Sequence, residues 1–350
     1  MAPRVVVAMS GGVDSSVAAA LLQEQDYQVI GVTLRLFPEA PASAASRHPC
    51  CLTPEVNDAR EVAARLGIPY YVLNFERPFS QAVIDYFFEE YAHGRTPNPC
   101  LRCNQVIKFR LLLSKALALG AEYLATGHYA RIVQDGGHHL LQGSDPTKDQ
   151  SYFLYTLGQG ELARLLMPVG GLTKARVREM ARSLALPVAD KEESQDLCFV
   201  PGDLRGFLAQ HLGTRPGEVV DREGRVLGRH PGIAFFTVGQ RHGLGLASPR
   251  PLYVTHIDAE NHRVVVGLRE ELDGRELRLH PVSWVSGKPP DSQQVLARLR
   301  YRSSLVPARI EGNGEGVRVV FQDPQPRVAP GQAVVFYSGD EVLGGGIVAE

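Results

Sequence analysis

Two cysteines, Cys100 and Cys103, stand in a C-x-x-C pair within the segment TPNPCLRCN. Such a pair can supply half of a zinc site, a redox couple, ligands for an iron–sulfur cluster or a nucleophile that handles sulfur. Pro97 and Pro99 directly precede the pair and predict an exposed loop, which argues against an inert, packed pair. A third cysteine, Cys198 in ESQDLCFV, can join them only if the fold brings distant segments together.

The other two cysteines, Cys50 and Cys51, are adjacent. Adjacent thiolates chelate one tetrahedral metal ion poorly, whereas structural zinc sites use spaced pairs, so the pattern disfavours zinc. We assign no chemistry to Cys50 and Cys51. Sulfur chemistry is favoured instead, in which one thiolate carries a sulfur atom and a second thiolate releases it by forming a disulfide.

The second chemical motif is SGGVDSS, from Ser10 to Ser16, which follows an apolar run and opens a helical pattern. A strand followed at once by a helix points backbone N–H groups and the positive helix end at one spot, which suits a phosphate. The segment lacks the G-x-x-x-x-G-K-[ST] pattern, so it is not a Walker loop. Asp14 would repel phosphate unless it holds a metal ion, and the motif therefore predicts Mg²⁺ as a bridge. A plain glycine turn before a helix would not need serines on both sides of Asp14.

The composition is that of an ordinary globular protein, with 44% hydrophobic and 21% charged residues in 350. This length predicts two or three domains. The net charge of −1 excludes a uniformly basic nucleic-acid binder but leaves room for a local basic face. No apolar run approaches the ~20 residues of a membrane span, and the first residues lack a signal-peptide pattern. The sequence therefore predicts a cytoplasmic protein with no membrane partner.

The order of the sequence patterns predicts an α/β fold class. Strand-like and helix-like segments alternate at first; PEVNDAREVAARLG, for example, has Pro54 and Gly67 at the ends of a predicted helix. This alternation predicts a parallel sheet covered on both faces, in a domain over residues 1–205. Short alternating runs then predict a small central β domain over 206–275 and a C-terminal β-barrel over 276–350. The polar segment 39–49 is predicted to be a surface loop.

Seven motifs together resemble one known family. In chain order they are SGGVDSS, NPCLRCN, ATGHYAR, KDQSYFLYTL, KEESQDLCFV, GQRHGLG and RYRSSLVPA. The chain is similar to the bacterial tRNA-specific 2-thiouridylases (MnmA type) of the pyrophosphatase-loop ATPase superfamily, whose nucleotide-binding domain is adenine nucleotide α-hydrolase-like. The resemblance implies an ATP-dependent sulfurtransferase that replaces O2 of the wobble uridine (position 34) of tRNA with sulfur.

This reaction would explain both motifs. A uracil carbonyl oxygen is a poor leaving group, so it must be adenylated before sulfur displaces it, and ATP becomes AMP and pyrophosphate. By the resemblance, Asp14 is catalytic, and the ATP site also includes Leu34 and Gly127. The remaining expected ATP-binding residues are those of the first strand end and the loop: Ala8, Met9, Ser10, Gly11, Gly12, Val13, Asp14 and Ser15.

The resemblance also gives the cysteines roles. Cys103 is expected to be the nucleophile and Cys198 the persulfide carrier. Some family members have Asp at the position of Cys100, where transfer would use two cysteines only. Here Cys100, Cys103 and Cys198 could instead hold a [4Fe–4S] cluster with one open iron. The sequence does not choose between a relay and a cluster; we favour the cluster, because a third cysteine beside two reactive thiols is otherwise an oxidation liability.

The expected macromolecular partner is the anticodon arm of tRNA, and the expected sulfur donor is a cysteine desulfurase or a sulfur-relay protein. Arg300 and Arg302 are predicted to alternate on a strand, so that both point the same way toward phosphate. The residues expected by resemblance to contact tRNA are Asn98, Pro99, Cys100, His128, Lys148, Asp149, Gln150, Arg300, Tyr301, Arg302 and Gln332.

Two other classes of function stay open. Another pyrophosphatase-loop enzyme could adenylate a small molecule, but it would need neither the cysteines nor the β domains. A non-catalytic tRNA-binding or ATP-binding module would need neither an intact SGGVDSS nor three placed cysteines. Pyrophosphate release that depends on tRNA would separate these classes from the thiolating enzyme.

Overall fold

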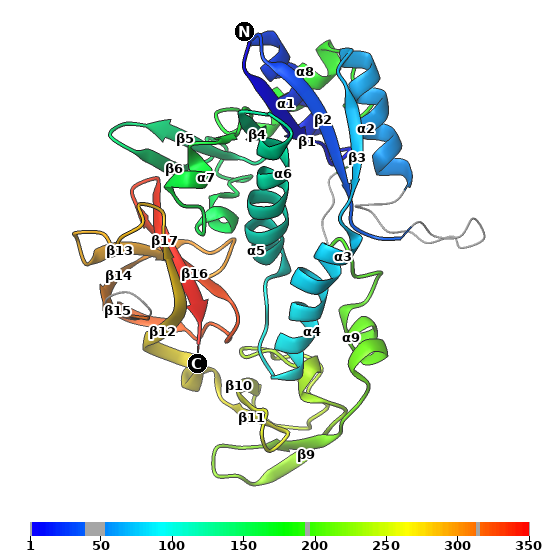
Figure 1. Ribbon diagram of the computed structural model, residues 1–350. Coiled ribbons are helices and arrows are strands. Elements are labelled where there is room, and N and C mark those ends of the chain that lie inside the picture. The colour runs from blue at the N-terminus through cyan, green and yellow to red at the C-terminus, as the bar shows by residue number, and fades with distance from the viewer. Residues whose placement is uncertain (1, 39–52, 193–196, 313–315, 350) are drawn as a thin grey trace.

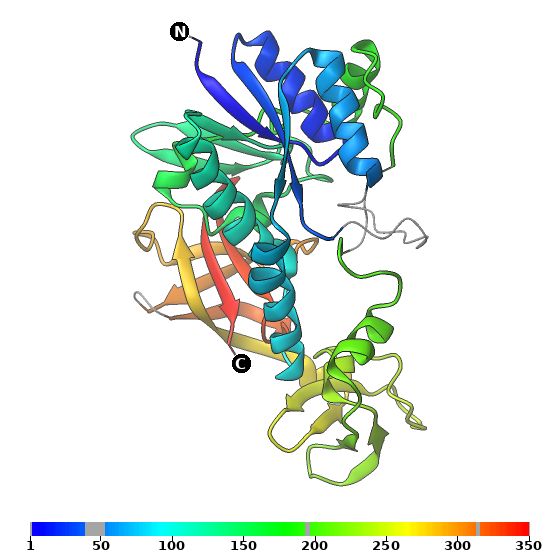
Figure 2. The same ribbon diagram turned by 45° about the vertical axis from the view of Figure 1, so that its right-hand side comes forward.

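The computed structural model of the protein describes residues 2–38, 53–192, 197–312 and 316–349. Within these ranges the strands form a parallel sheet, a small central sheet and a β-barrel (Figure 1). The parallel sheet and the central sheet lie at opposite ends of the molecule, and the barrel lies beside the helices between them (Figure 2). The predicted loop 39–49 and the pair Cys50 and Cys51 lie outside the described residues.

The first sheet is parallel throughout, with the strand order β3-β2-β1-β4-β7. Along β1 the side chains alternate, so that Val5 and Val7 belong to one core and Val6 to another. This alternation shows that the sheet is buried on both faces, as predicted, and the α/β class is confirmed. The strands are β1 (Arg4–Ala8), β2 (Gln28–Arg35), β3 (Tyr70–Asn74), β4 (Tyr123–Ala125) and β7 (Leu165–Leu166).

Helices cover one face of this sheet, and helix and barrel residues cover the other. The first face packs against α1 (Val13–Glu24), α2 (Thr53–Leu66) and α8 (Lys174–Ser183). The second face shares a core with α6 (Leu113–Ala118) and with the barrel. The helix predicted from Pro54 is α2, and Gly67 follows it with a φ of 68°.

The order of the strands fixes where a ligand can bind. Strand β1 lies between β2 and β4. The chain builds the sheet outward from β1 first to one side, through β2 and β3, and then to the other side, through β4 and β7. In open α/β sheets, ligands bind outside the carboxyl ends of the strands at such a switch point. The SGGVDSS motif, which spans the turn after β1 and the first turn of α1, lies there.

Two long helices lead away from the sheet, and each contains a π-helical stretch. One runs through α3 (Glu76–Phe79), η1 (Ser80–Ile84) and α4 (Asp85–Ala92). The other runs through α5 (Pro99–Arg102), η2 (Cys103–Leu112) and α6. Both cysteines of the C-x-x-C pair therefore lie on a helix, and the predicted exposed loop is wrong.

The Asn-Pro sequence before these cysteines forms the start of a helix. Asn98 is the N-cap of α5, and its Oδ1 accepts from the backbone N–H groups of Cys100 at 3.1 Å and Leu101 at 3.3 Å. Pro99 occupies the first helical position, where an N–H would have no partner within the helix. Cys100 and Cys103 are one helical turn apart and so share a face.

The central sheet has the strand order β10-β11-β8-β9 and a core of its own around Val219, Val254 and Val264. In the chain, the helix α9 (Leu204–Leu212) precedes this sheet, and the short helix η4 (Ile233–Phe235) lies between its strands β9 and β10. Its strands are β8 (Gly217–Val220), β9 (Val226–His230), β10 (Tyr253–Asp258) and β11 (Arg263–Gly267).

Six strands close the C-terminal barrel, because β12 pairs with both β15 and β17. The predicted C-terminal β-barrel is therefore confirmed. The short helix η5 (Arg269–Leu272) leads into it. The strands are β12 (Asp273–Trp284), β13 (Gln294–Arg298), β14 (Leu305–Glu311), β15 (Val317–Pro326), β16 (Ala333–Ser338) and β17 (Glu341–Val348).

A hairpin from the first part of the chain extends the barrel sheet. It consists of β5 (Ala130–Gln134) and β6 (His138–Gln142), and β6 pairs with β17. An ion pair joins Arg131 to Asp340 at 2.5 Å, and His139 pairs with Glu341 at 2.6 Å. The chain then forms η3 (Ser151–Leu154) and α7 (Gln159–Leu162) before β7. The first domain and the barrel thus share a continuous sheet and a core, although no sequence pattern predicts this joint.

The strand predicted at residues 300–302 is instead a turn between β13 and β14. The Ser303 hydroxyl donates to the Arg300 carbonyl at 3.0 Å and accepts from the Arg300 N–H at 3.1 Å. These bonds form a turn and prevent the alternating side chains of a strand.

No helix in the described ranges is long and apolar enough to cross a membrane.

Candidate active site

The SGGVDSS segment forms a tight loop after β1 and the first turn of α1, and this whole segment is called the SGGVDSS loop below. The Ser10 N–H donates to Ser15 Oγ at 3.2 Å, and Ser15 Oγ donates to the Gly12 carbonyl at 3.1 Å. Ser16 Oγ donates to the same carbonyl at 2.8 Å. These bonds hold the loop around the start of α1, where the first backbone N–H groups have no partner within the helix. The geometry suits an anion, as the sequence indicates.

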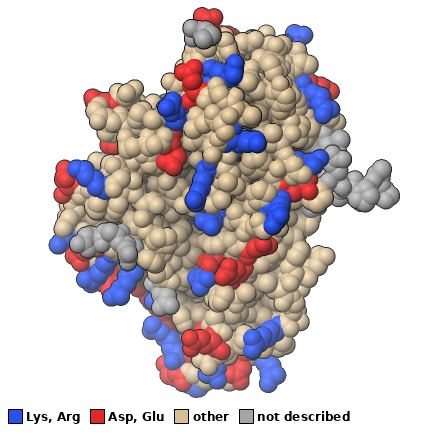
Figure 3. All heavy atoms as spheres, viewed as in Figure 1, with Lys and Arg blue, Asp and Glu red and all other residues tan. Residues whose placement is uncertain are grey.

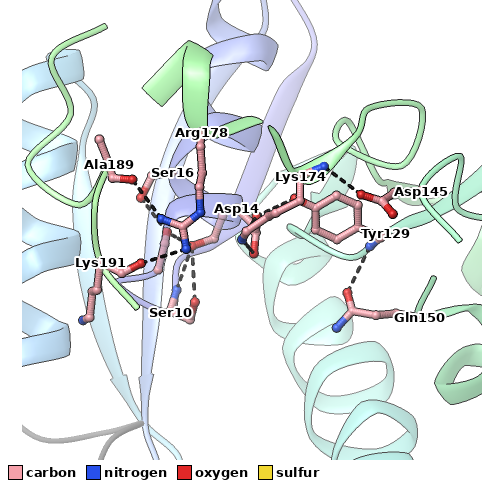
Figure 4. A network of polar contacts seen from close by, with 12 residues as sticks. Ser10, Asp14, Ser16, Tyr129, Asp145, Gln150, Lys174, Arg178, Ala189 and Lys191 are labelled. Carbon is pink, nitrogen blue, oxygen red and sulfur yellow. Dashed lines mark hydrogen bonds and ion pairs between the residues drawn. The ribbon is translucent and has the colours of Figure 1, made fainter. Parts of the chain in front are cut away.

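Asp14 pairs with a lysine and a tyrosine from two distant segments (Figure 4). Lys174 Nζ donates to the two carboxylate oxygens of Asp14 at 2.6 and 2.8 Å, and the Tyr129 hydroxyl donates to Oδ1 at 2.7 Å. The Lys174 side chain is 11% exposed and that of Asp14 31%. Lys174 is the first residue of α8, and its N–H donates to Asp145 Oδ2 at 3.0 Å. A cation therefore lies beside the loop.

A second cation contacts the loop from its other side. Lys191 Nζ donates to the Gly11 carbonyl at 3.2 Å and pairs with Asp58 at 2.5 Å. Arg178 of α8 donates to the carbonyls of Ala189 and Lys191 at 3.2 and 3.1 Å, which fixes the segment that carries Lys191. Lysines therefore bracket the loop, and their charges favour an anionic ligand there.

Gly127 and His128, just after β4, lie beside the SGGVDSS loop. A Cβ on Gly127 would lie 2.6 Å from the Ser15 nitrogen and 2.7 Å from the Asp14 carbonyl carbon, so only glycine allows this close approach. His128 is buried, and its Nδ1 lies 2.7 Å from Thr126 Oγ1. Burial, with a smaller contribution from the charge of Lys108, lowers the pKa of His128 well below its ordinary 6.5. The imidazole is therefore neutral at physiological pH.

One cavity of about 400 Å³ joins the SGGVDSS loop to the three cysteines of the sulfur motifs. The predicted ATP-site residues that line it are Ala8, Met9, Ser10, Asp14, Ser15, Leu34 and Gly127. Cys100, Cys103 and Cys198 line the same cavity, as do Pro99, His128 and Gln150. Gly11, Gly12 and Val13, also predicted for the ATP site, belong to the motif but are not among the residues that line the cavity. The fold thus brings Cys198 to the pair, as the sequence requires.

The surroundings of the three cysteines differ. Cys100 is exposed, whereas Cys103 and Cys198 are half-buried and pack against one aromatic cluster that includes Phe79 and Phe199. No disulfide joins the three cysteines to one another. Cys103 and Cys198 thus share both a cavity and a hydrophobic wall, which favours a reaction between these two thiols.

The cysteine arrangement does not fit the predicted iron–sulfur cluster. In the described part of the chain, no three His, Cys, Asp or Glu side chains are gathered closely enough to hold a metal ion. A [4Fe–4S] cluster needs its thiolate ligands gathered around one centre. Cys100, Cys103 and Cys198 share the cavity without that convergence, so the structure does not support our preference for a cluster.

The turn at residues 300–302 adjoins this cavity. The Tyr301 ring lies 4.3 Å from that of Phe153, which lines the cavity, and the Arg302 guanidinium lies 5.8 Å from the Tyr301 ring. Burial raises the pKa of Tyr301, and the nearby charge of Arg302 partly opposes this effect. Arg300 and Arg302 are exposed. This turn could therefore contact a large ligand whose reacting group enters the cavity.

Some residues expected to contact tRNA have internal partners. Asp149 is 4% exposed, and its carboxylate accepts from the N–H groups of Gly143 and Ser151 and from Arg298 Nη1 at 2.8 Å. Such a buried carboxylate has its charge compensated within the protein, so its side chain acts as a joint between η3 and the barrel. Lys148 is half-buried, and Gln150 Oε1 accepts from the Tyr129 N–H at 3.0 Å.

Asn98 and Gln332 also have partners inside the protein. Asn98 caps α5, and Gln332 Nε2 donates to the Thr96 carbonyl at 2.8 Å. Both side chains are half-buried. Sequence reasoning missed Lys174, Tyr129 and Lys108 as parts of the site. The N-cap Thr173 signals the start of α8, but nothing in the sequence directs Lys174 to Asp14.

Family models match almost the whole chain. A tRNA methyl transferase HUP domain matches residues 3–202, a tRNA methyl transferase PRC-barrel domain residues 205–268, and an aminomethyltransferase beta-barrel domain residues 274–348. Among solved structures, a 4-thiouridine synthetase–RNA complex with bound ATP is 15% identical and has a TM-score of 0.36. It covers 57% of this chain and 46% of that chain, and the similarity is too low to bear on the fold.

Full-length relatives are much more similar. A protein of Geobacter metallireducens named tRNA-specific 2-thiouridylase MnmA is 52% identical, over 98% of this chain and 96% of its own. Proteins with the same name from Magnetococcus marinus and Carboxydothermus hydrogenoformans are each 51% identical. The former match covers 98% of both chains, and the latter covers 99% of this chain and 97% of the relative.

Proposed function

The chain belongs to the tRNA-specific 2-thiouridylase family, and from this premise we propose that it adenylates and then thiolates the wobble uridine of tRNA in one cavity. One observation carries the proposal: residues of the SGGVDSS loop and three cysteines line the same cavity of about 400 Å³. An activated base and a sulfur carrier must meet without diffusing apart, and a shared cavity allows this.

In the first step, O2 of the uridine attacks the α-phosphorus of ATP, and the bond to pyrophosphate breaks. The SGGVDSS loop would hold the departing phosphates with backbone N–H groups, and Lys174 would add a positive charge beside them. His128, buried and neutral, would face the base as a hydrogen-bonding group without adding charge. Gly127 would keep the loop close to β4, so that base and nucleotide share the space.

Asp14 is the residue that would hold Mg²⁺. Among the described residues that line the cavity, Asp14 is the only one with an acidic side chain. One carboxylate can be enough, because Mg²⁺ that is bound with ATP needs few protein carboxylates. The ion would offset phosphate charge. Asp14 holds Lys174 and Tyr129 in this structure, so it also orients the lysine toward the loop.

In the second step, sulfur displaces AMP. A persulfide on Cys198 would attack C2 of the adenylated uridine, and the C2–O bond would break to release AMP. Cys103 would then attack the Cys198 sulfur, forming a Cys103–Cys198 disulfide and releasing 2-thiouridine. A dithiol reductant would restore both thiols, and a persulfide donor, such as a cysteine desulfurase or a sulfur-relay protein, would reload Cys198. The common cavity and aromatic wall of the two residues support this relay.

The anticodon arm of tRNA would lie across the turn between β13 and β14. Arg300 and Arg302 are exposed there and would contact phosphates, while Tyr301 and Lys148 would contact the nucleotides nearby. Lys and Arg are interspersed with Asp and Glu on the face in Figure 3. Recognition would therefore depend on a few placed cations and not on a uniformly basic face.

Methyl transfer and small-molecule adenylation are weaker alternatives. The family models carry names from methyl transfer, but the full-length relatives carry a thiolation name. Neither methyl transfer nor adenylation of a small molecule would require cysteines at the cavity wall. A non-catalytic binding module would not need three cysteines at the wall of the same cavity.

The test is pyrophosphate release with and without tRNA, combined with mass spectrometry of the nucleosides. We expect release to depend on tRNA and to match the amount of 2-thiouridine. Release without tRNA, driven by a small molecule, would instead support the small-molecule adenylating enzyme.

Substitution of Cys100 tests the relay. Cys100→Ser should keep measurable thiolation with a persulfide donor, whereas Cys103→Ala and Cys198→Ala should abolish it while tRNA still binds. The wild-type protein is purified without oxygen for iron and sulfide analysis. Bound iron that is lost together with activity in Cys100→Ser would overturn the relay and favour a cluster.

A further inference from the structure

Thr96, four residues before Cys100, is bonded by two other domains. Its N–H donates to the Pro330 carbonyl of the barrel at 2.7 Å, and its carbonyl accepts from Gln332 Nε2 at 2.8 Å. Its hydroxyl donates to Thr237 Oγ1 in the central domain at 3.1 Å. The N–H, the carbonyl and the hydroxyl of Thr96 are thus each bonded to a domain other than its own.

The packing around Thr96 is as close as its hydrogen bonding. Gly331 has a φ of 88°, and a Cβ on it would lie 3.1 Å from the backbone atoms of Thr96. On the other side, a Cβ on Gly94 would lie 2.5 Å from the side chain of Ile257 in the central domain. Residues 94–96 are therefore clamped between the barrel and the central domain, near the end of α4 (Figure 1).

A short, stiff segment connects Thr96 to the cysteines. Pro97 and Pro99 restrict their own φ angles, and both residues are buried. Asn98 between them caps α5 through the N–H of Cys100. Because this segment is stiff, a displacement of Thr96 is transmitted to Cys100 and to the helical turn that carries Cys103.

The clamp also lies next to the turn expected to bind tRNA. Arg300 Nη2 donates to the Arg327 carbonyl at 2.8 Å, and Arg327 Nη1 donates to the Thr255 carbonyl of the central domain at 3.2 Å. Three residues after Arg327 comes Pro330, the acceptor for Thr96. A tRNA phosphate that draws Arg300 away would thus act on the segment that holds Thr96.

We propose that Thr96 is a positioning residue for Cys103, through which the arrangement of the barrel and central domain around bound tRNA sets the reactivity of the cysteine pair. The proposal rests on the proposed function, since it concerns the same sulfur transfer. Thr96 touches neither base nor nucleotide in this account. Its hydroxyl bond to Thr237 is the link that a single substitution can remove.

Thr96→Val removes that hydroxyl and keeps the side-chain shape, while Thr96→Ser restores the hydroxyl. We expect Thr96→Val to lower the single-turnover thiolation rate at saturating tRNA roughly three- to tenfold, the scale of one hydrogen bond, with the Kd for tRNA unchanged. Thr96→Ser should recover the rate. Thr237→Val should match Thr96→Val, and the double variant should be no slower than either, because both remove the same bond.

A second readout does not depend on thiolation. The rate at which iodoacetamide alkylates Cys103, followed by peptide mass spectrometry, should change when tRNA binds the wild type. This change should be lost in Thr96→Val. Thr255→Val is the matched control, because the Thr255 hydroxyl is buried in the central domain but donates within it, to the Val265 carbonyl at 3.2 Å. The control should behave as the wild type in both assays.

Gln332→Ala separates positioning from direct tRNA contact. If Gln332 acts by holding Thr96, the saturating rate falls and the Kd for tRNA stays the same. A weaker Kd with an unchanged saturating rate would assign Gln332 to tRNA and would remove one support of the proposal.

The proposal is overturned if Thr96→Val keeps the wild-type rate and alkylation response, or if Thr255→Val loses both equally. Failure of the proposed function looks different. The wild type would then form no 2-thiouridine on any tRNA, while the alkylation assay would still show whether Thr96 positions Cys103.

Discussion

Lys174 is the residue whose role follows from the structure and not from the sequence, so its replacement is an informative test. Lys174→Met removes the ammonium group and keeps a long apolar side chain. It breaks the two bonds to Asp14, at 2.6 and 2.8 Å, and leaves the carboxylate with the Tyr129 hydroxyl. The proposed function gives Lys174 two effects, one on stability and one on adenylation.

The burial of the Asp14–Lys174 pair sets the expected stability change. Exposed ion pairs contribute about 0–1 kcal/mol, whereas breaking a buried pair costs about 3–5 kcal/mol. With side chains 11% and 31% exposed, this pair lies between these limits, and we expect Lys174→Met to lower the free energy of unfolding by about 2 kcal/mol. In Asp14→Asn with Lys174→Met no charge is left uncompensated, so the double variant should lose about 1–2 kcal/mol less than the sum of the single variants.

The effect on adenylation should be larger. Removing one charged donor from a site where charge develops costs about 3–4 kcal/mol of transition-state stabilisation, which corresponds to a loss on the order of 10²–10³-fold in rate. The assay is pyrophosphate release at saturating tRNA and ATP, together with urea unfolding. Lys115→Met, at an exposed lysine on α6, is the control and should change neither quantity. Wild-type pyrophosphate release by Lys174→Met would refute the role of Lys174 beside the phosphates.

Other perturbations test separate parts of the site. Arg300→Ala with Arg302→Ala should weaken tRNA binding and reduce the slope of log K against log salt by about one unit per lost phosphate contact; an unchanged slope would show that the turn does not meet phosphate. Gly127→Ala should abolish ATP binding in a folded protein, because its Cβ would meet the Ser15 nitrogen at 2.6 Å; normal ATP affinity would contradict this. The pKa of His128 is depressed in the folded protein, so below about pH 6.5 the unfolded chain takes up a proton that the native ring does not. The free energy of unfolding therefore decreases as the pH is lowered, by at most about 1.4 kcal/mol per pH unit. His128→Asn should lose this part of the pH dependence, as measured by urea unfolding between pH 5 and 7.

The sequence predicted the parts of the site whose function requires a local pattern. A phosphate loop needs a strand, small residues and a helix in succession, so the local sequence is enough to place SGGVDSS at the end of β1. The parallel sheet is predictable because strand-like runs such as RVVVA alternate with helical patterns along the chain, and this order is typical of a parallel sheet. The joining of Cys198 to the pair was required by the chemistry, and the fold supplied it.

Features that depend on contacts between distant segments were not predicted. Lys174 meets Asp14 across 160 residues, and no local pattern directs one toward the other. Arg300 and Arg302 were placed on a strand because alternation alone does not reveal the Ser303 bonds that close a turn. Prolines near the C-x-x-C pair favour a loop as long as they act as helix breakers, but Asn followed by Pro is also a signal for the start of a helix, as it is at α5.

The most direct test of the central claim follows the oxygen atom that leaves the base. A tRNA carrying oxygen-18 at O2 of the wobble uridine is incubated with the protein, ATP and a persulfide donor, and the AMP is analysed by mass spectrometry. Adenylation and displacement within one cavity predict one oxygen-18 atom in AMP for each 2-thiouridine formed. Unlabelled AMP alongside full thiolation would contradict the account, because ATP would then activate something other than the base.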